Sequence, residues 1–409
     1  HGSCDRYVYL ARRIVLDDSK KLSAFDLHEF LHDCCYLGRS EAAVATTASM
    51  SIQASRVVNG FWLIFFGLSV VADLNLVPGL SGFLRAVAKR GKDDEGDDPA
   101  GKRRRPWWQV TVPHGWFTHF YVVGVLWNAV ALFHSLIECA WAGSDPSVVG
   151  AALASTLFQA HVTRRLYESA FVSIHRPGGR MHVVGYLIGV VYYICVPLTL
   201  AHPLAAAAVV GSVADAWRRG SIAYLLEPID GTKLEAAADG ARHVLKFAFT
   251  ASGRSGVGAL MSGFCVAGGV YAWWVGNAHQ HRYHVALAEL RGGEKRRENV
   301  EKKEREGAAK EYGVPRGGWF ERVSCPHYAA EVLLYAGICA VACGSGFGAG
   351  GIATGVAGFG PAVAAARTTP MLASVGANLS LAARRNHEWY LRHMPDYPKG
   401  RWAMIPGIL

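Results

Sequence analysis

The stretch SCPHYAAE, residues 324–331, decides the fold class, because it carries polar side chains directly into an apolar run of membrane length. Further polar motifs lie nearby: YGVPRGGWFE at 312–321, NHEWYL at 386–391 and YPKGR at 397–401. A helix needs about 20 mainly apolar residues to cross the hydrocarbon core of a bilayer. Polar motifs placed between such runs predict a membrane protein whose functional site lies near the ends of its helices.

The composition agrees with this prediction. Of 409 residues, 51% are hydrophobic and 18% are charged, and the mean hydropathy is +0.16. The net charge of +10 comes mostly from basic residues in segments that flank apolar runs. That placement is typical of the positive-inside rule and not of a nucleic-acid groove, so we expect no nucleic-acid partner.

We expect an all-α, polytopic membrane bundle of about seven transmembrane helices. Residues 1–55 form an extension of unknown role, 56–106 the first span and a charged cytosolic linker, and 107–409 the main domain. The expected spans are 56–80, 117–142, 150–172, 182–201, 257–278, 328–345 and 369–385.

Loop charges predict the orientation of these spans. The basic loops 85–105, 173–181 and 279–326 are expected in the cytosol, and 203–256 in the lumen. The apolar piece 203–217 is short and rich in alanine, so we expect a lumenal or interfacial helix there. The G-x-G-x-x-G at 346–351 lacks the strand and helix of a dinucleotide-binding unit, so we expect helix packing or a turn.

The third span ends in QAHVTRRLYES, residues 159–169, where ionisable groups stand inside an apolar helix. Such groups are costly in a membrane and are functional candidates. Helical spacing puts Arg164, Tyr167 and Glu168 on one side of the helix. The same spacing places His161, Arg165 and Glu168 together on an adjacent side. Two hypotheses stay open: the arginines snorkel to the interface beside Glu168, or this face points into the bundle at a substrate head group.

The run HQHRYH, residues 279–284, is a candidate metal motif, but nothing else in the sequence completes a ligand set. HEWYL at 387–391 lacks the second histidine of H-E-x-x-H. We therefore predict no metal.

Together these motifs resemble the C-terminal domain of the steroid 5α-reductase family, and within it the polyprenol reductase branch. The resemblance covers about 110–409, including VPHGWFTHFY at 112–121 and the Arg-Arg-x-Tyr-Glu run that begins at Arg164. Steroid-reducing members have Tyr where this chain has Val162, and their N-terminal glutamate motif is not recognisable here. These departures favour the polyprenol branch.

The resemblance implies NADPH as cofactor, held by the C-terminal part, about 257–409. The implied cofactor-binding residues are Arg316, Tyr328, Glu331, His387, Glu388, Tyr390 and Arg401. We assign catalytic roles to Glu168, Tyr167 and His327, and substrate contacts to His119, Tyr121, Arg164 and Arg165. Arg316 stands beside two glycines that let backbone approach a ligand, and Arg401 can bind phosphate.

The implied reaction is reduction of the α-isoprene double bond of polyprenal or polyprenol, in dolichol synthesis for N-glycosylation. A conjugated carbonyl makes the alkene a hydride acceptor, so we expect the aldehyde and not the alcohol to be the direct substrate. Glu168 or Tyr167 would polarise the aldehyde oxygen. The expected partners are a long-chain polyisoprenoid and membrane lipids, in the endoplasmic reticulum, with no obligate protein partner. Three alternatives stay open: a steroid or trans-2-enoyl-CoA reductase of the same superfamily, an isoprenylcysteine-type membrane methyltransferase, and a non-enzymatic scaffold.

Overall fold

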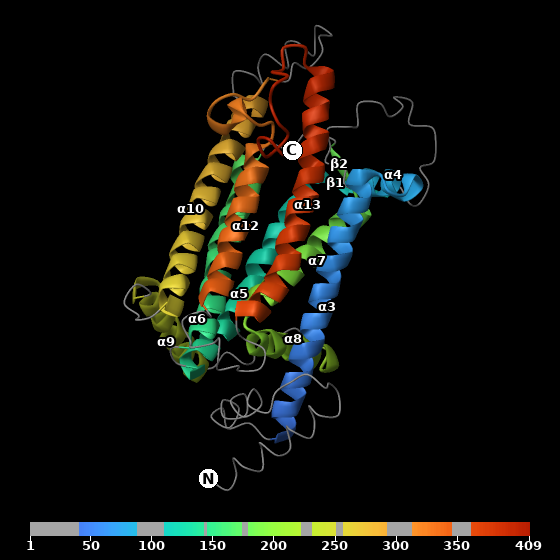
Figure 1. Cartoon of the computed structure of the whole chain (residues 1–409). Helices are drawn as coiled ribbons and strands as arrows, with labels where there is room; N and C mark the ends of the chain where they lie inside the picture. Colours follow the sequence, from blue (N-terminus) through green and yellow to red (C-terminus); the bar gives the residue numbers. More distant parts are fainter. Residues whose placement is uncertain are drawn as a thin grey trace.

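A computed structural model describes residues 41–87, 110–142, 145–173, 179–221, 231–250, 257–292, 313–345 and 361–409. These residues form a bundle of long helices with very little β-structure (Figure 1). Residues 1–40 of the predicted extension, most of the charged linker and the Gly-rich motif at 346–351 lie outside the described residues.

Seven long helices each contain or overlap one of the predicted spans. They are α3 (Glu41–Leu74), α5 (Phe117–Ala142), α6 (Pro146–Tyr167), α7 (Val183–Leu200), α10 (Val257–Gly292), α12 (Pro326–Gly344) and α13 (Pro361–His393). Among the described residues, four stretches are long and apolar enough to cross a membrane: Gln53–Leu74, His114–Ala140, Val183–Leu200 and Pro326–Gly344. The all-α membrane bundle is therefore confirmed, whereas the count of seven spans stays a prediction.

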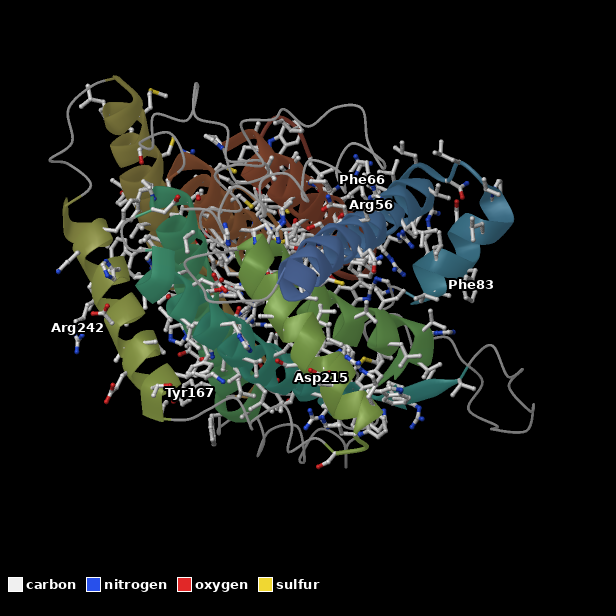
Figure 2. The ribbon with its side chains drawn as sticks, turned by 90° about the horizontal axis from the view of Figure 1, so that it is seen from below. Arg56, Phe66, Phe83, Tyr167, Asp215 and Arg242 are labelled. Atoms are coloured by element: carbon white, nitrogen blue, oxygen red, sulfur yellow. The ribbon has the colours of Figure 1, made fainter. Side chains whose placement is uncertain are left out.

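The other elements lie at the two ends of the bundle. α8 (Pro203–Arg218) forms the helix expected at 203–217, and α9 (Gly231–Thr250) follows it at the same end (Figure 1). At the other end are α4 (Pro78–Val87) and a two-stranded antiparallel sheet of β1 (Thr111–Pro113) and β2 (Arg180–His182). Viewed from below, α4 and α9 lie on opposite sides of the bundle (Figure 2). α9 is not among the helices expected from the sequence.

Local sequence sets where several helices begin. Asp145 caps α6, because its carboxylate accepts a hydrogen bond from the backbone N–H of Ser147 at 2.7 Å, and Pro146 occupies the first helical position. Pro326 takes the same position in α12. His182 caps α7 by accepting from the N–H of Val184 at 3.1 Å. Each of these caps stands next to an apolar run, so the boundaries follow from short-range signals.

The C-terminal tail folds back on the segment that precedes α12. The N–H groups of Ser324 and Cys325 donate to the carbonyls of Trp402 and Ala403, at 2.8 and 3.0 Å. The turn η6 (Gly318–Glu321) lies just before this segment. Pairing of the tail with residues 324–325 therefore brings together two sequence motifs that are about 80 residues apart.

α10 and α12 pack so closely that glycine is required between them. A Cβ on Gly269 would lie 2.7 Å from the carbonyl oxygen of Gly337, and one on Gly276 would lie 2.7 Å from that of Ala330. The small residues repeat every seven positions on both helices, which keeps them on the shared face. Small residues at such contacts let helix backbones approach in membrane proteins.

We predict that Gly337→Ala destabilises the protein. The new methyl group would meet the carbonyl of Gly269 and lie 2.6 Å from the backbone nitrogen of Trp273, so α10 must move. Overpacking of this kind lowers the free energy of unfolding by roughly 1–3 kcal/mol. The measurement is thermal unfolding in detergent.

The matched control is Gly268→Ala, because a Cβ there meets nothing within 4 Å. Alanine favours a helix over glycine by up to about 1 kcal/mol, so this variant should melt at or above the wild-type temperature. Equal effects of the two changes would contradict the close packing.

Candidate active site

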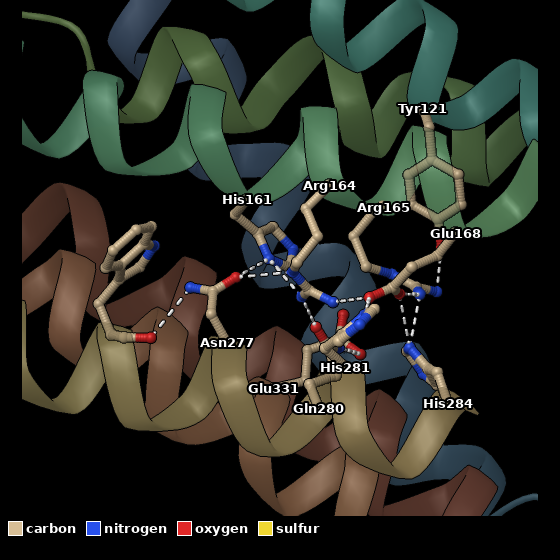
Figure 3. Close-up of polar contacts among 11 residues, drawn as sticks. Tyr121, His161, Arg164, Arg165, Glu168, Asn277, Gln280, His281, His284 and Glu331 are labelled. Atoms are coloured by element: carbon tan, nitrogen blue, oxygen red, sulfur yellow. Dashed lines mark hydrogen bonds and ion pairs between the residues drawn. The ribbon is translucent and has the colours of Figure 1, made fainter. Parts of the chain in front are cut away.

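The centre of the site is the carboxylate of Glu168, which is fully buried at the end of α6. Its Oε1 contacts Nη1 of Arg164 and lies 2.7 Å from Nδ1 of His281. Its Oε2 contacts Nη1 of Arg165 and lies 2.8 Å from Nδ1 of His284 (Figure 3). Four basic side chains from two helices therefore surround one carboxyl group.

This environment favours the ionised form of Glu168. An uncompensated buried carboxylate loses several kcal/mol of hydration, which ion pairs offset only when the geometry is good and the remaining lone pairs are bonded. Here Arg164 and Arg165 lie one turn before Glu168, at i−4 and i−3, and reach one carboxylate oxygen each. The two arginines thus point inward to the carboxylate, and the carboxylate holds them there.

A second chain of hydrogen bonds joins α6 to α10 and α12. Arg164 donates through Nη2 to Oε1 of Gln280, and Nε2 of Gln280 donates to Glu331 at 3.1 Å. Arg164 also donates through Nε to Oδ1 of Asn277 at 3.2 Å, and Nδ1 of His161 lies 3.1 Å from that oxygen. Arg164 is therefore bonded directly to α10, and Gln280 links it to α12.

A cavity of about 220 Å³ opens beside Arg165. Its polar side is lined by Tyr121, Arg165, His284, Tyr328 and Glu331. Most of its remaining lining is aromatic or aliphatic, from Phe65, Val87, Phe117, Phe120, Met181, Ile188, Tyr192, Tyr193, Val375, Leu379, Leu381 and Ala382. His114, Gly185, Gly189, Asn378 and Arg385 complete the lining. A few polar groups at one side of an apolar cavity are typical of a site that orients one polar end of a ligand.

Tyr121 is the hydrogen-bond donor best placed to meet such a polar end. Its hydroxyl oxygen accepts a hydrogen bond from Nη2 of Arg165 at 2.6 Å, and the guanidinium carbon lies 4.9 Å from the centre of the Tyr121 ring. Arginine can only donate, so the hydroxyl hydrogen of Tyr121 stays available for an acceptor in the cavity. The positive charge of Arg165 strengthens that donor.

A second group, which we call the tail cluster, consists of Ser324, His387, Tyr390, Tyr397 and Arg401. Ser324 lies 2.6 Å from Nδ1 of His387 and accepts from the hydroxyl of Tyr397 at 2.6 Å. Tyr390 stacks on Tyr397 with ring centres 4.9 Å apart. Arg401 is buried, donates through Nη1 to the carbonyl of Pro315 at 2.9 Å, and covers the ring of Tyr397 at 5.1 Å.

Glu321, in the loop before α12, lies next to the tail cluster. The N–H of Gly317 donates to its carboxylate at 2.6 Å, and this bond lowers the pKa of Glu321, as do the charges of Arg401 and Arg316. Its carboxylate is 3.6 Å from Nη2 of Arg401. The loop and the tail are therefore linked by charge as well as by backbone pairing.

The structure brings most of the sequence-predicted residues into these two groups. Around Glu168 and the cavity are Tyr121, Arg164, Arg165, Tyr328 and Glu331, and the ring of His327 lies 5.6 Å from that of His284. In the tail cluster are His387, Tyr390 and Arg401.

Four predicted residues lie elsewhere. Tyr167 is 56% exposed on the outer side of α6, against Phe171 (Figure 2). His119 is exposed, with its Nδ1 3.1 Å from the hydroxyl of Tyr186. Glu388 is exposed and pairs with Arg392, and Arg316 is exposed in the loop before α12.

Four residues of the site were not expected from the sequence: Asn277, Gln280, His281 and His284. These residues follow each other at spacings of three and four along α10, which puts them on neighbouring positions of one helix face. That spacing is the signal that identifies them. The partner face, 113–119 residues away on α6, is not visible in the sequence.

Comparison with known proteins identifies one family. The profile described as 3-oxo-5-alpha-steroid 4-dehydrogenase matches residues 244–345 and 370–409, which include α10, α12 and the tail. The chain is similar to "Polyprenal reductase 1" of Oryza sativa subsp. indica, with 31% identity over 73% of this chain and 80% of that protein. It is similar to "Polyprenal reductase 1" of Arabidopsis thaliana, with 30% identity over 73% and 82%. "Polyprenal reductase" of Xenopus laevis is 30% identical over 76% and 83%.

We predict that Glu168→Gln destabilises the protein strongly. The amide keeps the shape but removes the charge, which leaves Arg164 and Arg165 without their common anion. Removing one member of a buried ion pair lowers the free energy of unfolding by about 3–5 kcal/mol. The measurement is thermal or denaturant unfolding in detergent.

Asp239→Asn is the matched control. Asp239 and Arg242 on α9 form an exposed pair at the same i,i+3 spacing, with an N–O distance of 2.9 Å. Exposed pairs contribute about 0–1 kcal/mol, so this variant should unfold close to the wild type. A small effect at Glu168 as well would show that its carboxylate does not hold the site together.

Proposed function

The chain belongs to the steroid 5α-reductase family, in its polyprenal reductase branch, and from this membership we propose that it reduces the α-isoprene double bond of a polyprenal with hydride from NADPH. The observation that carries the proposal is the Tyr121 hydroxyl, polarised by Arg165, among the polar groups that line a mostly apolar cavity. The aldehyde oxygen of the substrate is the acceptor that fits this donor. The isoprenoid chain fits the aromatic and aliphatic lining.

The chemistry of the double bond favours the aldehyde over the alcohol. An isolated alkene resists hydride, whereas an α,β-unsaturated aldehyde accepts hydride at its β-carbon while negative charge develops on oxygen. A donor that is already in place stabilises this charge most, because no reorganisation is needed as the reaction occurs. Tyr121 supplies that donor, and a polyprenol offers no carbonyl for it to polarise.

Glu168 then acts through charge. Both of its oxygens are occupied by arginine and histidine, which favours the ionised form and leaves no proton for a substrate oxygen. Tyr167 faces away from the cavity, so the role of polarising the carbonyl passes to Tyr121. Glu168 positions Arg165, and Arg165 positions Tyr121 and polarises its hydroxyl.

The tail cluster has the donors that a nucleotide phosphate requires. Among the described residues, Nε and Nη2 of the buried Arg401 make no hydrogen bond, and the nearest carboxylate, that of Glu321, lies 3.6 Å from Nη2. A phosphate bound there would satisfy both donors. Gly317 and Gly318 have φ angles of 91° and 58°, and a Cβ on Gly317 would meet nothing within 4 Å. This open backbone turn lies beside Arg401 and before the N-terminus of α12, where anions are favoured.

NADPH bound to these residues would supply the hydride. We assign Arg401 and the turn at 317–318 to its phosphates, and Tyr328 and Glu331 to the boundary between cofactor and cavity. His387 and Tyr390 hold the tail in place beside the proposed phosphate site, through Ser324 and Tyr397. His327 lies between Tyr328 and His284, and we keep it as a candidate contact of the reacting groups.

This activity places the protein in the conversion of polyprenol to dolichol, which supports protein N-glycosylation. We propose the endoplasmic reticulum membrane as its location and a long-chain polyisoprenoid as its lipid substrate. The membrane-length helices and the relatives' names support this proposal.

We predict that Tyr121→Phe lowers kcat for polyprenal by about 10²-fold or more, because loss of one donor to a developing oxyanion has an effect of this size. The variant keeps the aromatic contacts of Tyr121, so the melting temperature should change little. The assay follows NADPH oxidation by purified protein with polyprenal, polyprenol or a 3-oxo-Δ4 steroid.

Tyr271→Phe is the control, since Tyr271 is 66% exposed on α10 and far from the cavity lining. It should retain the wild-type rate. Faster turnover of the steroid than of polyprenal by the wild type would contradict the proposed substrate. An unchanged rate in Tyr121→Phe would contradict the proposed donor.

We also predict that NADPH raises the melting temperature and that S-adenosylmethionine does not. A ligand that binds only the folded state stabilises it by about 2.7 kcal/mol when its concentration is 100 times Kd. Arg401→Ala should weaken the shift, because it removes the buried cation. Arg242→Ala, on the exposed face of α9, should leave it unchanged. If S-adenosylmethionine raised the melting temperature and NADPH did not, the reductase proposal would be wrong and the methyltransferase alternative would be favoured.

A further inference from the structure

We propose that His284 donates the proton that completes the reduction, and that Glu168 and His281 supply its replacement from the solvent-exposed side of α10. This inference rests on the proposed function, because hydride addition to an enal leaves an enolate that needs one proton at its α-carbon. The structure offers a continuous path for that proton.

The path consists of two imidazoles bridged by one carboxylate. Nδ1 of His281 is 2.7 Å from Oε1 of Glu168, and Nδ1 of His284 is 2.8 Å from Oε2 (Figure 3). The His281 side chain is 45% exposed, Glu168 is 0% exposed and His284 is 15% exposed. His284 also lines the cavity. One end of the path therefore reaches the surface of the bundle, in the segment 279–326 that we expect in the cytosol, and the other lines the cavity.

His284 has a suitable partner in either protonation state. When it is charged, its Nδ1–H donates to Oε2 of Glu168 at 2.8 Å. When it is neutral with the hydrogen on Nε2, Nδ1 accepts from Nη1 of Arg165 at 2.6 Å. A group that must gain and lose a proton in each turnover needs both arrangements, and a purely structural histidine needs only one.

The charges around His284 balance the enolate. Its titratable and charged neighbours come from four helices: Tyr121, Arg164, Arg165, Glu168, His281, His327, Tyr328 and Glu331. The two arginines and the two glutamates cancel formally, so protonation of His284 adds one positive charge beside the cavity. Burial and the charge of Arg165 lower the pKa of His284 to about 3, so the imidazole is neutral before the reaction. The negative charge of an enolate beside the ring opposes both effects and favours the proton on His284 at the stage where it is needed.

The proposed step conserves atoms and charge. Hydride from a reduced nicotinamide forms a C–H bond at the β-carbon, and the π-electron pair moves toward the oxygen that Tyr121 binds. The enolate then takes the Nε2 proton of charged His284 at its α-carbon, and the carbonyl reforms. His284 becomes neutral with its remaining hydrogen on Nδ1, and the nicotinamide is oxidised. The ring of His284 then turns over, so that its hydrogen faces the cavity and its bare nitrogen faces Glu168 and Arg165. His281 takes a proton from the buffer, and one proton passes from it through Glu168 to that nitrogen.

The test compares His284→Gln and His281→Ala with the wild type. We expect His284→Gln to lower kcat by about 10²-fold or more, with little change in KM, because a general acid contributes about 10²–10⁴-fold. His281→Ala should lower kcat less, and imidazole added to the buffer should restore it, since His281 is half-exposed. His243→Gln on α9, which is remote from the cavity, is the control and should keep the wild-type rate.

Two readouts separate proton delivery from a structural role. The solvent deuterium isotope effect on kcat should rise in His281→Ala, where proton resupply becomes slower, and fall again when imidazole is added. The NADPH-induced melting shift, which requires no turnover, should stay at the wild-type value in both variants.

The outcomes are distinct from those that test the function. If the wild type does not reduce polyprenal, the proposed function fails. If the wild type reduces polyprenal and His284→Gln retains its rate, the proton donor is another group and only the inference fails. Lack of rescue by imidazole in His281→Ala, or loss of the melting shift in either variant, would also overturn the proton path.

Discussion

The site depends on one buried carboxylate that is kept ionised. Glu168 has no exposed surface, and its two oxygens bind two arginines from its own helix and two histidines from α10. Burial of this charge is favourable only if every partner is present and well placed. The same partners form the proposed reaction site: Arg165 polarises the hydroxyl of Tyr121, and His284 lines the cavity. The interaction that stabilises the centre of the bundle therefore also orients the groups proposed to act on the substrate.

Close packing of α10 and α12 makes this arrangement possible. Gly269 and Gly276 let the α12 backbone approach, so that Gln280 can bridge Arg164 and Glu331 across three helices. Glycine has a similar effect in the cavity wall. A Cβ on Gly189 would lie 2.6 Å from the ring of Phe120, and one on Gly124 would lie 2.7 Å from that of Tyr193. Because Gly189 and Gly124 have no side chain, the rings of Phe120 and Tyr193 can pack directly against the helix backbone.

The two halves of the proposed chemistry lie on different parts of the chain. The carbonyl site is built by α5, α6 and α10, whereas the phosphate site is built by the loop before α12 and the tail that pairs with it. α12 links them, because Tyr328 and Glu331 line the cavity while the residues just before the helix bind the tail. Arg401 reaches this region because the tail folds back on residues 324–325.

Much of this could be predicted from sequence, for physical reasons. Apolar runs of membrane length predict helices, caps such as Asp145 set their ends, and ionisable residues inside such runs mark a site, because each is costly there. Helical spacing showed that Arg164, Arg165 and Glu168 could meet, and motif resemblance identified the family. Spacing does not show which face of a helix points inward. Only the tertiary structure turned Arg165 toward Tyr121 and Tyr167 toward the outside, and brought His281 and His284 to Glu168 from more than 100 residues away. These contacts depend on how α6 and α10 pack, and that packing is determined by the whole bundle.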